Sequence, residues 1–327
     1  MNDSNKIIVK VVVVAMFERG TPDDGNPGEL ELWVQREKLD QSIPFPAGQF
    51  DLRMNEDGLL AVLTGMGPAN AASIVTALGC DSRFNLSKAY WIVAGIAGVD
   101  PNDASIGSAA WAEYVVDGDI MHEMDSSEVP EDWPYGKLSL SANEPNKRSP
   151  HVTDSDITFK LNKGLVDWAY NLTKDHPLPD YPELAEFREQ FKGYPMAIRP
   201  PFVLKGDSLG TGSYWHGDTL NKWANDWVRM YTEGEGNFVM ANMEDNGTAK
   251  ALKHLSKAGL VDFNRLLVLR TASNYSTPPQ GQDAQWHFTA PFVLRGMPSI
   301  EAAYELGSIV AHEIIKNWDE YGENIPE

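Results

Sequence analysis

Ile7–Ala15 reads IIVKVVVVA, and this nearly unbroken β-branched run decides the fold class. Such a run is typical of a strand buried on both faces, as the inner strands of a parallel sheet are. Three more apolar runs of strand length follow, at Leu59–Thr64, Tyr90–Ala94 and Leu266–Thr271. We therefore expect a sheet whose central strands are covered on both sides by other layers.

Segments with helical spacing separate these runs, with apolar side chains recurring every three or four residues. The alternation of strands and helices predicts an α/β protein, a three-layer α/β/α fold around a central mixed sheet. The helices are expected over 68–78, stopped by Gly79; over 218–230, capped by Asp218; over 244–259; and over 299–318, capped by Ser299.

Shorter segments complete the pattern. Glu29–Gln35 (ELELWVQ) alternates between apolar and polar residues, which predicts a half-exposed strand. Ser108–Val116 and Asn237–Ala241 are also expected to be strands. Gly95-Ile96-Ala97-Gly98 predicts a glycine-rich turn after the strand at Tyr90–Ala94.

A proline-rich insertion interrupts this regular order. Ten prolines lie between residues 117 and 204, and we expect loops there with helices near 160–174 and 183–192. The segment lacks the repeats of a low-complexity linker. We therefore expect one domain over residues 1–327, with 117–204 as a loop-rich insertion.

The composition excludes several classes of protein. The 327 residues include 27 Lys and Arg against 47 Asp and Glu, a formal net charge of −20, so nucleic acid is an unfavourable partner. The single cysteine, Cys80, excludes an internal disulfide and a thiolate zinc site. The longest uncharged stretch, Leu59–Cys80, contains Gly65, Gly67 and Pro68, which predict a strand, a turn and a helix rather than a membrane span.

The location in the cell stays open on this evidence. The opening residues MNDSNK contain no hydrophobic signal region. The chain then enters a strand almost at once, which suits a cytoplasmic protein or an exported one without its leader.

Ligands of open α/β sheets bind at the carboxyl ends of the strands, so the residues after Ala15, Thr64, Ala94, Ala241 and Thr271 are the ones to inspect. Neither a dinucleotide-binding G-x-G-x-x-G fingerprint nor a phosphate loop ending in Gly-Lys-Ser/Thr stands at these points. Nucleoside di- and triphosphates are therefore poorly supported as ligands.

Several passages in order carry a resemblance to a known family. Gly65–Ala72 (GMGPANAA), the strand with its glycine turn at 90–98, Met243-Glu244 and Arg270–Asn274 (RTASN) look like the nucleoside phosphorylase/nucleosidase superfamily. Nearly the whole chain more closely resembles the purine nucleoside permease (NUP) family, which is related to that superfamily. The four passages that carry this match are VAGIAGVDPNDASIGSAAWAEYVVDGD (93–119), PPFVLKGDSLGTGSYWHG (200–217), MEDNGTAKAL (243–252) and VLRTASNYS (268–276).

The resemblance implies a purine nucleoside as ligand and cleavage of its N-glycosidic bond. Glu244 would hold the 2′ and 3′ hydroxyls and stabilise the developing ribosyl cation, while Met243 would pack on the sugar. Asn274 would donate a hydrogen bond to the leaving purine, which favours 6-oxopurines. On position alone, Glu244 is equally an acid in the first turn of a helix, and Asn274 an Asx-turn residue.

The chain departs from the pattern of the phosphorolytic members. Val93 and Ile96 stand where one large branch of the superfamily has the Arg and Ser that bind phosphate. Arg19 lies nearby, but a single arginine is a weak phosphate-binding site. Hydrolysis needs only a water and a base, and the hydrolytic members carry a glutamate soon after the first strand. Glu18 lies one residue short of that register, and its alternative role is that of an exposed loop acid.

The residues expected around the base and sugar are less specific. Aromatic faces stack well on purines, but Trp215 and Tyr214 are also ordinary core residues. The candidate substrate-binding residues are Phe17, Gly95, Ile96, Ala97, Asp207, Ser208, Tyr214, Trp215, Met243, Glu244 and Asn274, and the candidate catalytic residues are Glu18, Glu244 and Asn274.

No cofactor and no metal are expected. The acidic cluster around His122, Glu123, Asp125 and Glu128 lacks the spacing of a metal site and suits a solvated loop, and Trp223 and Trp227 have core spacing. Two functions stay open: a purine nucleosidase acting by water rather than phosphate, and a non-catalytic protein that binds nucleosides for uptake. The family resemblance leaves a homo-oligomer open and favours a periplasmic location. The family word permease implies a transport role, but the sequence predicts no membrane-spanning helix, so we do not expect the chain itself to form a channel.

Overall fold

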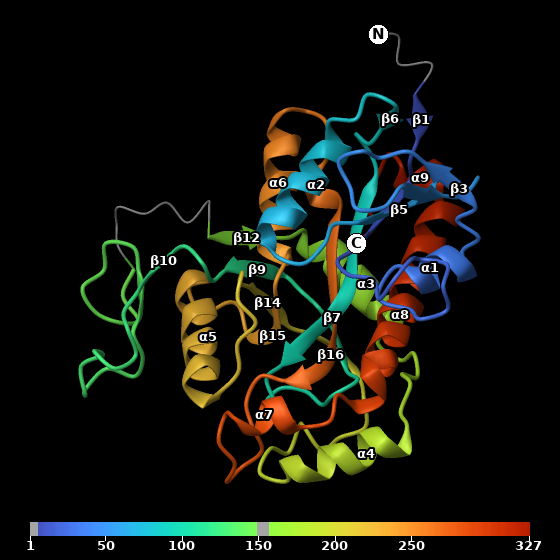
Figure 1. Cartoon of the computed structure of the whole chain (residues 1–327). Helices are drawn as coiled ribbons and strands as arrows, with labels where there is room; N and C mark the ends of the chain where they lie inside the picture. The colour runs from blue at the N-terminus through green and yellow to red at the C-terminus, as the bar shows by residue number, and fades with distance from the viewer. Residues whose placement is uncertain (1–5, 149–156) are drawn as a thin grey trace.

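A central mixed sheet organises the molecule in this computed structural model, which describes residues 6–148 and 157–327 (Figure 1). Its strands run in parallel and antiparallel pairs, as predicted. Along the main path they are β12 (Thr158–Lys160), β9 (Tyr114–Asp117), β14 (Asp207–Gly210), β15 (Phe238–Asn242), β7 (Tyr90–Val99), β2 (Val11–Ala15), β5 (Leu59–Leu63), β4 (Leu52–Met54) and β3 (Gln41–Ile43). Off this path lie β16 (Leu266–Tyr275), β8 (Ala109–Trp111) and β13 (Val203–Lys205).

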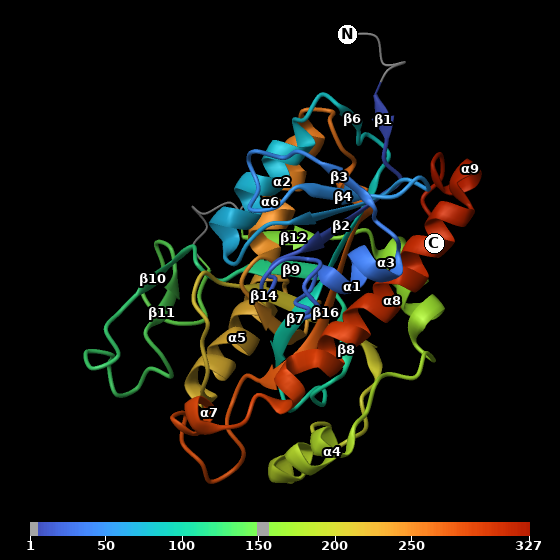
Figure 2. The same cartoon turned by 45° about the vertical axis from the view of Figure 1, so that its right-hand side comes forward.

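Helices cover both faces of this sheet, which gives the expected three layers (Figures 1 and 2). One face carries α2 (Pro68–Gly79), α5 (Asp218–Tyr231) and α6 (Asp245–Lys257). The other carries α1 (Glu31–Arg36), α3 (Lys163–Thr173) and α8 (Met297–Lys316). The short α9 (Trp318–Tyr321) follows α8, and 3₁₀ turns lie at η4 (Phe263–Arg265) and η5 (Val293–Gly296).

The opening apolar run forms the centre of the core. All five residues of β2 are buried, and β2 pairs in parallel with β5 on one side and β7 on the other. The first two residues of the run instead form β1 (Ile7–Ile8), which pairs with β6 (Phe84–Asn85) outside the main sheet.

Several local predictions were wrong. Glu29–Gln35 is not a strand: Glu31–Arg36 forms helix α1, whose Leu32, Trp33 and Val34 are buried. The predicted turn at Gly95–Gly98 is absent, because β7 continues to Val99 and pairs with β16 through these glycines. Ser108–Val116 divides into β8 and β9.

Two predicted helix caps were also wrong. The residue before α5 is Gly217, with φ of 130°, and Asp218 is already the first helical residue. Helix α8 begins at Met297 after Gly296, and the Ser299 hydroxyl donates instead to the carbonyl of Ala272 at 2.7 Å. That hydrogen bond ties α8 to strand β16.

The insertion contributes to the sheet and also to one end of the molecule. Within 117–204, residues 149–156 lie outside the described residues; β12 joins the sheet edge, and the hairpin of β10 (Met121–Glu123) and β11 (Lys137–Ser139) projects from the body (Figure 1). Helix α4 (Pro182–Arg188), continued by η3 (Glu189–Phe191), lies beyond the carboxyl ends of β7 and β16, close to α7 (Trp286–Thr289) (Figures 1 and 2). A single domain over 1–327 stays a prediction.

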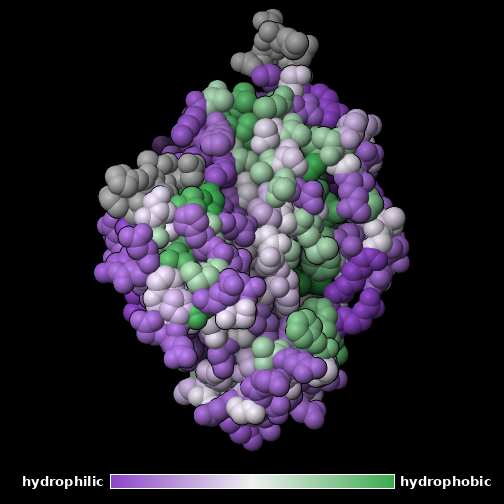
Figure 3. All heavy atoms as spheres, turned by 60° about the vertical axis from the view of Figure 1, so that its left-hand side comes forward, coloured by the Kyte–Doolittle hydropathy of each residue, from purple (hydrophilic) through white to green (hydrophobic). Residues whose placement is uncertain are grey.

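The surface combines hydrophilic and apolar regions (Figure 3). On the face in Figure 3, hydrophilic side chains dominate both flanks, and apolar side chains gather along the middle. In the part of the chain that the structure describes, no helix combines the length and the apolar character that a membrane span requires.

Candidate functional site

A pocket of about 240 Å³ opens where five segments meet: the ends of β2 and β15, the loop after β5, and the second halves of β7 and β16. These are the five places that the sequence singles out, although the residues after Ala94 and Thr271 lie within β7 and β16 and not beyond their ends. The pocket is lined by Met16, Phe17, Glu29, Met66, Ile96, Ala97, Gly98, Tyr214, Ala241, Asn242, Met243, Glu244, Arg270, Ser273 and Asn274.

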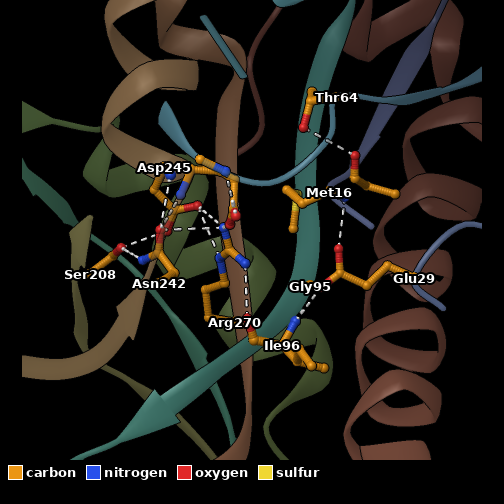
Figure 4. Close-up of polar contacts among 12 residues, drawn as sticks. Met16, Glu29, Thr64, Gly95, Ile96, Ser208, Asn242, Asp245 and Arg270 are labelled. Atoms are coloured by element: carbon orange, nitrogen blue, oxygen red, sulfur yellow. Dashed lines mark hydrogen bonds and ion pairs between the residues drawn. The ribbon is translucent and has the colours of Figure 1, made fainter. Parts of the chain in front are cut away.

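A buried arginine organises the floor of this pocket (Figure 4). The Arg270 guanidinium donates to Asp245 Oδ1 at 2.6 Å from Nη2 and 3.0 Å from Nε, and to Glu244 Oε2 at 3.0 Å. Its Nη1 donates to the carbonyl of Ile96 at 2.9 Å. Burial alone would lower the pKa of Arg270, but the two carboxylates hold it above its ordinary value, so the side chain stays charged.

Glu244 has one oxygen on this arginine and the other near the loop after β5. Its Oε1 accepts a hydrogen bond from the backbone N–H of Gly67 at 3.2 Å. Gly67 has a φ of 94°, a conformation that residues with a Cβ rarely adopt, so glycine is needed to aim this N–H. The carboxylate is thereby fixed at the pocket wall.

Asn242 and Ser208 hold the start of α6 in place. The side-chain oxygen of Asn242 accepts from the backbone N–H groups of Glu244 and Asp245, at 3.1 and 2.9 Å. The Ser208 hydroxyl donates to Asp245 Oδ2 at 2.5 Å and accepts from Asn242 Nδ2 at 2.6 Å. Ser208 therefore positions other residues and does not line the pocket.

A second buried carboxylate, Glu29, faces the same pocket from the opposite side (Figure 4). Its two oxygens accept from the backbone N–H of Met16 at 2.8 Å and of Ile96 at 2.7 Å. The side chain is 4% exposed. Burial raises the pKa of Glu29 to about 7, with a smaller contribution from the Glu244 charge and an opposing one from Arg270. A carboxylate with this pKa can take and return a proton near neutral pH.

The other end of the pocket is formed by Asn274 and Tyr214. Asn274 Nδ2 donates to the carbonyl of Tyr275 at 3.2 Å, and its Oδ1 accepts from the Ser273 hydroxyl at 3.1 Å. Tyr214 is 56% exposed, and its hydroxyl lies 2.7 Å from His287 Nε2. Trp215 lines a small adjoining recess of about 20 Å³.

The structure brings most of the predicted site residues together. Those that line the pocket or its adjoining recess are Phe17, Ile96, Ala97, Tyr214, Trp215, Met243, Glu244 and Asn274. Gly95 lies behind the wall: a Cβ added there would be 2.0 Å from Met16 Cε and 2.5 Å from Glu29 Oε1. Val93 and Ile96, which stand where the phosphorolytic relatives have phosphate-binding Arg and Ser, are both apolar. Val93 is buried in the sheet, and Ile96 presents an alkyl side chain.

Glu18 and Asp207 do not line this pocket, and both carboxylates bind backbone N–H groups elsewhere. Glu18 accepts from the N–H groups of Leu30 and Glu31, at 3.1 and 2.8 Å, and so binds the start of α1. Asp207 accepts from Glu113, Tyr114 and Asn237 backbone N–H groups at 3.1, 2.7 and 2.7 Å, where it joins neighbouring strands. Burial raises the pKa of Asp207 to about 6.

Sequence reasoning missed Glu29 and Arg270. Glu29 was placed in a half-exposed strand, so its burial could not be foreseen. Arg270 had a signal: an arginine inside the apolar run LLVLRT must meet buried carboxylates, because an unpaired buried charge is too costly.

The tryptophans and the acidic cluster that the sequence excludes from the site do not line the pocket. Trp223 and Trp227 are buried in the core, as predicted. His122 and Glu123 are exposed on β10, and Glu123 pairs with Lys137. Across residues 6–148 and 157–327, no three His, Cys, Asp or Glu side chains cluster as metal ligands would.

The amino-acid sequence matches a known protein family and individual proteins described by the same name. Residues 8–326 match the model of the family described as purine nucleoside permease (NUP). A Candida albicans protein described as purine nucleoside permease is 31% identical over 267 residues, which cover 80% of this chain and 65% of that protein. The chain thus spans slightly less than two thirds of this relative's length.

Solved structures resemble the chain in fold. The 5′-methylthioadenosine/S-adenosylhomocysteine nucleosidase from Neisseria meningitidis superposes with a TM-score of 0.54 at 14% identity, covering 93% of this chain and 99% of that one. The futalosine hydrolase of Helicobacter pylori gives a TM-score of 0.54 at 13% identity, covering 93% and 98%. At these identities the likeness concerns the fold alone.

Proposed function

Since the chain belongs to the purine nucleoside permease (NUP) family, we propose that it binds purine nucleosides and hydrolyses their N-glycosidic bond to free base and ribose. The observation that carries this proposal is the pocket itself, in which two buried carboxylates, Glu29 and Glu244, lie on either side of Arg270. The fold that the chain shares with nucleosidases supports the same assignment.

Glu244 and Met243 would hold the sugar. The Glu244 carboxylate is fixed by Arg270 and by the Gly67 N–H, and its remaining lone pairs can accept hydrogen bonds from two ribose hydroxyls. Its negative charge also stabilises the positive charge that develops on the sugar as the bond to the base breaks. Met243 adds an apolar surface beside it.

Glu29, and not Glu18 as the sequence predicts, would act as the base toward water. Glu29 lines the pocket, and its pKa of about 7 leaves part of the population ionised at neutral pH. The ionised carboxylate removes a proton from water, the water oxygen bonds to C1′, and the C1′–N9 electron pair leaves with the purine. Asn274 donates a hydrogen bond to the departing base, whose proton then comes from solvent because an amide cannot transfer one.

Phosphate is a poor nucleophile for this pocket. The one guanidinium among the lining residues, that of Arg270, is already bound to Glu244 and Asp245. Two buried carboxylates also disfavour entry of a further anion. These features support water over phosphate.

The alternative is a protein that binds nucleosides for uptake without cleaving them. The relatives' description as permeases favours this function. It would use the same contacts from Glu244, Met243 and Asn274 but would need no base at Glu29.

Chromatographic product analysis tests the proposal. Purified protein is incubated with inosine, guanosine and adenosine, with and without phosphate. We expect free base without phosphate, and a loss of about 10²–10⁴-fold in kcat for Glu29→Gln with little change in KM. Glu186→Gln, on the exposed side of α4, is the matched control. Base released only with phosphate would show phosphorolysis, and saturable binding without product would favour the uptake function.

A further inference from the structure

A second, larger cavity adjoins the nucleoside pocket. It measures about 340 Å³, and Ile96, Tyr214, Ser273 and Asn274 line both cavities. The residues assigned to the sugar and to water, Glu29, Met243, Glu244 and Arg270, line only the first. The second cavity therefore continues from the end of the pocket where Asn274 and Tyr214 would meet the base.

The walls of this second cavity are mainly aromatic. Phe187 on α4 stacks on Tyr275 with ring centroids 6.3 Å apart and planes 6° apart, and lies 5.9 Å from Trp286 on α7. His287, Pro291 and Phe292 complete the outer side. These residues come from the insertion, from β16 and from the segment before α8, which meet at one end of the molecule (Figures 1 and 2).

The two tyrosine hydroxyls within these walls are already engaged. The Tyr275 hydroxyl accepts from the backbone N–H of Ile106 at 3.1 Å and donates to the carbonyl of Ala197 at 2.8 Å. The Tyr214 hydroxyl pairs with His287, whose pKa is lowered by burial, so the pair is uncharged near neutral pH. The cavity thus offers apolar contact and few free hydrogen-bonding groups.

The size of the cavity suits a ring or branched alkyl group. An apolar cavity of about 150 Å³ in another protein binds benzene, so 340 Å³ leaves ample room for one phenyl group. Phe292 is 49% exposed at its edge, and an apolar ligand would cover part of this ring.

We propose that the chain selects purines with a bulky apolar substituent, such as a benzyl group, on an exocyclic amino group of the base, and that this substituent occupies the second cavity. This inference rests on the proposed function, because it requires the purine to lie at Asn274. It defines the class of nucleoside that the site prefers.

Calorimetric titration with free bases tests the inference, since bases are not consumed by cleavage. Adenine is compared with N6-benzyladenine, and guanine with N2-benzylguanine. We expect at least one benzylated base to bind about tenfold or more tightly than its parent, which corresponds to about 1.4 kcal/mol. The two nucleosides, adenosine and 5′-benzylthio-5′-deoxyadenosine, are compared on Glu29→Gln, which should cleave them too slowly to disturb the titration. We expect no comparable gain for the 5′-substituted nucleoside.

Two variants of neighbouring residues locate the effect. Ala290 lines the second cavity but not the first, so Ala290→Phe should abolish the gain and leave the parent bases within about twofold. Thr289 is exposed and lines neither cavity, so Thr289→Phe is the control and should change neither affinity.

Each outcome bears on one proposal. Parent bases and adenosine that bind while both benzylated bases bind no better would overturn the inference and leave the proposed function standing. A gain confined to the 5′-substituted nucleoside would place the cavity at the sugar end and also overturn it. If neither adenosine nor any base binds, the proposed function fails and this inference fails with it.

Discussion

The buried carboxyl of Glu29 leads to a prediction about stability that needs no substrate. Glu29→Gln keeps the shape of the side chain but removes its charge and its titration. The amide can accept from only one of the two N–H groups, of Met16 and Ile96, that now bind the carboxylate. This lost hydrogen bond costs about 1–3 kcal/mol at every pH.

A second contribution depends on pH. Folding raises the pKa of Glu29 from 4.5 to about 7, so the folded protein holds this proton more tightly than the unfolded chain does. At roughly 1.4 kcal/mol per pH unit the difference corresponds to about 3 kcal/mol. This stabilisation is fully present below pH 4.5 and is lost as the pH rises through about 7. The advantage of the wild type over Glu29→Gln should therefore shrink by about 3 kcal/mol across this range.

Urea unfolding followed by tryptophan fluorescence, at several values between about pH 5 and about pH 8, measures this difference. Taking the difference between the two proteins cancels the titration of the groups that do not interact with Glu29. Glu186→Gln is the control, and its difference curve should be flat because this side chain is exposed in α4. A flat curve for Glu29→Gln as well would show that Arg270 offsets the burial of Glu29, and would refute the reasoning.

Further predictions address the other buried groups. Arg270→Met should lower the free energy of unfolding by about 3–5 kcal/mol, because Glu244 and Asp245 lose their cation, and a loss below about 1 kcal/mol in urea unfolding would contradict this. Gly95→Ala should reduce kcat/KM for nucleoside cleavage, since its Cβ would displace Glu29; unchanged kinetics would argue against Glu29 as the base. Asp207→Ala should destabilise the fold, because three backbone N–H groups lose their acceptor, yet leave nucleoside affinity unchanged in calorimetry. The kcat/KM of the wild type should rise with pH to a plateau above about 7, and a profile without that inflection would exclude Glu29 as the base.

Much of the fold could be predicted because its central strands are apolar on both faces. The β-branched run at Val11–Ala15 has no polar face to expose, so burial between layers was the consistent solution. The helices at 68–79 and 245–257 could be predicted from the helical spacing of their apolar residues and from the glycines at which they were expected to stop. These signals are local and strong, and tertiary contacts did not override them.

The segment Glu29–Gln35 shows where local reasoning fails. Its alternation suits a strand, but Glu18 binds the N–H groups at the start of α1 and so stabilises a helix instead. The acceptor comes from more than ten residues away, and no spacing rule could supply it. The error hid Glu29 just before this helix.

The predictions of site residues also succeeded where local sequence position was sufficient and failed where distant contacts decided. Met243, Glu244 and Asn274 come two or three residues after the ends of predicted strands, and they line the pocket. Asp207 also lies at a strand, but its carboxylate binds backbone groups of neighbouring strands. Strand position alone does not tell whether a side chain faces the pocket or another strand.

The late position of β16 in the chain affects how the protein can reach its native state. β7 is synthesised early, yet its parallel partner β16 and the cation at Arg270 leave the ribosome more than 160 residues later. Until then Glu29, Glu244 and Asp245 have no cation to offset their burial, so this part of the sheet cannot close around them. Closure must await the last quarter of the chain, and pairing over such long sequence separation is slow. Nascent chains ending before β16 should thus be sensitive to proteolysis and bind chaperones, whereas chains that include it should become resistant in one cooperative step.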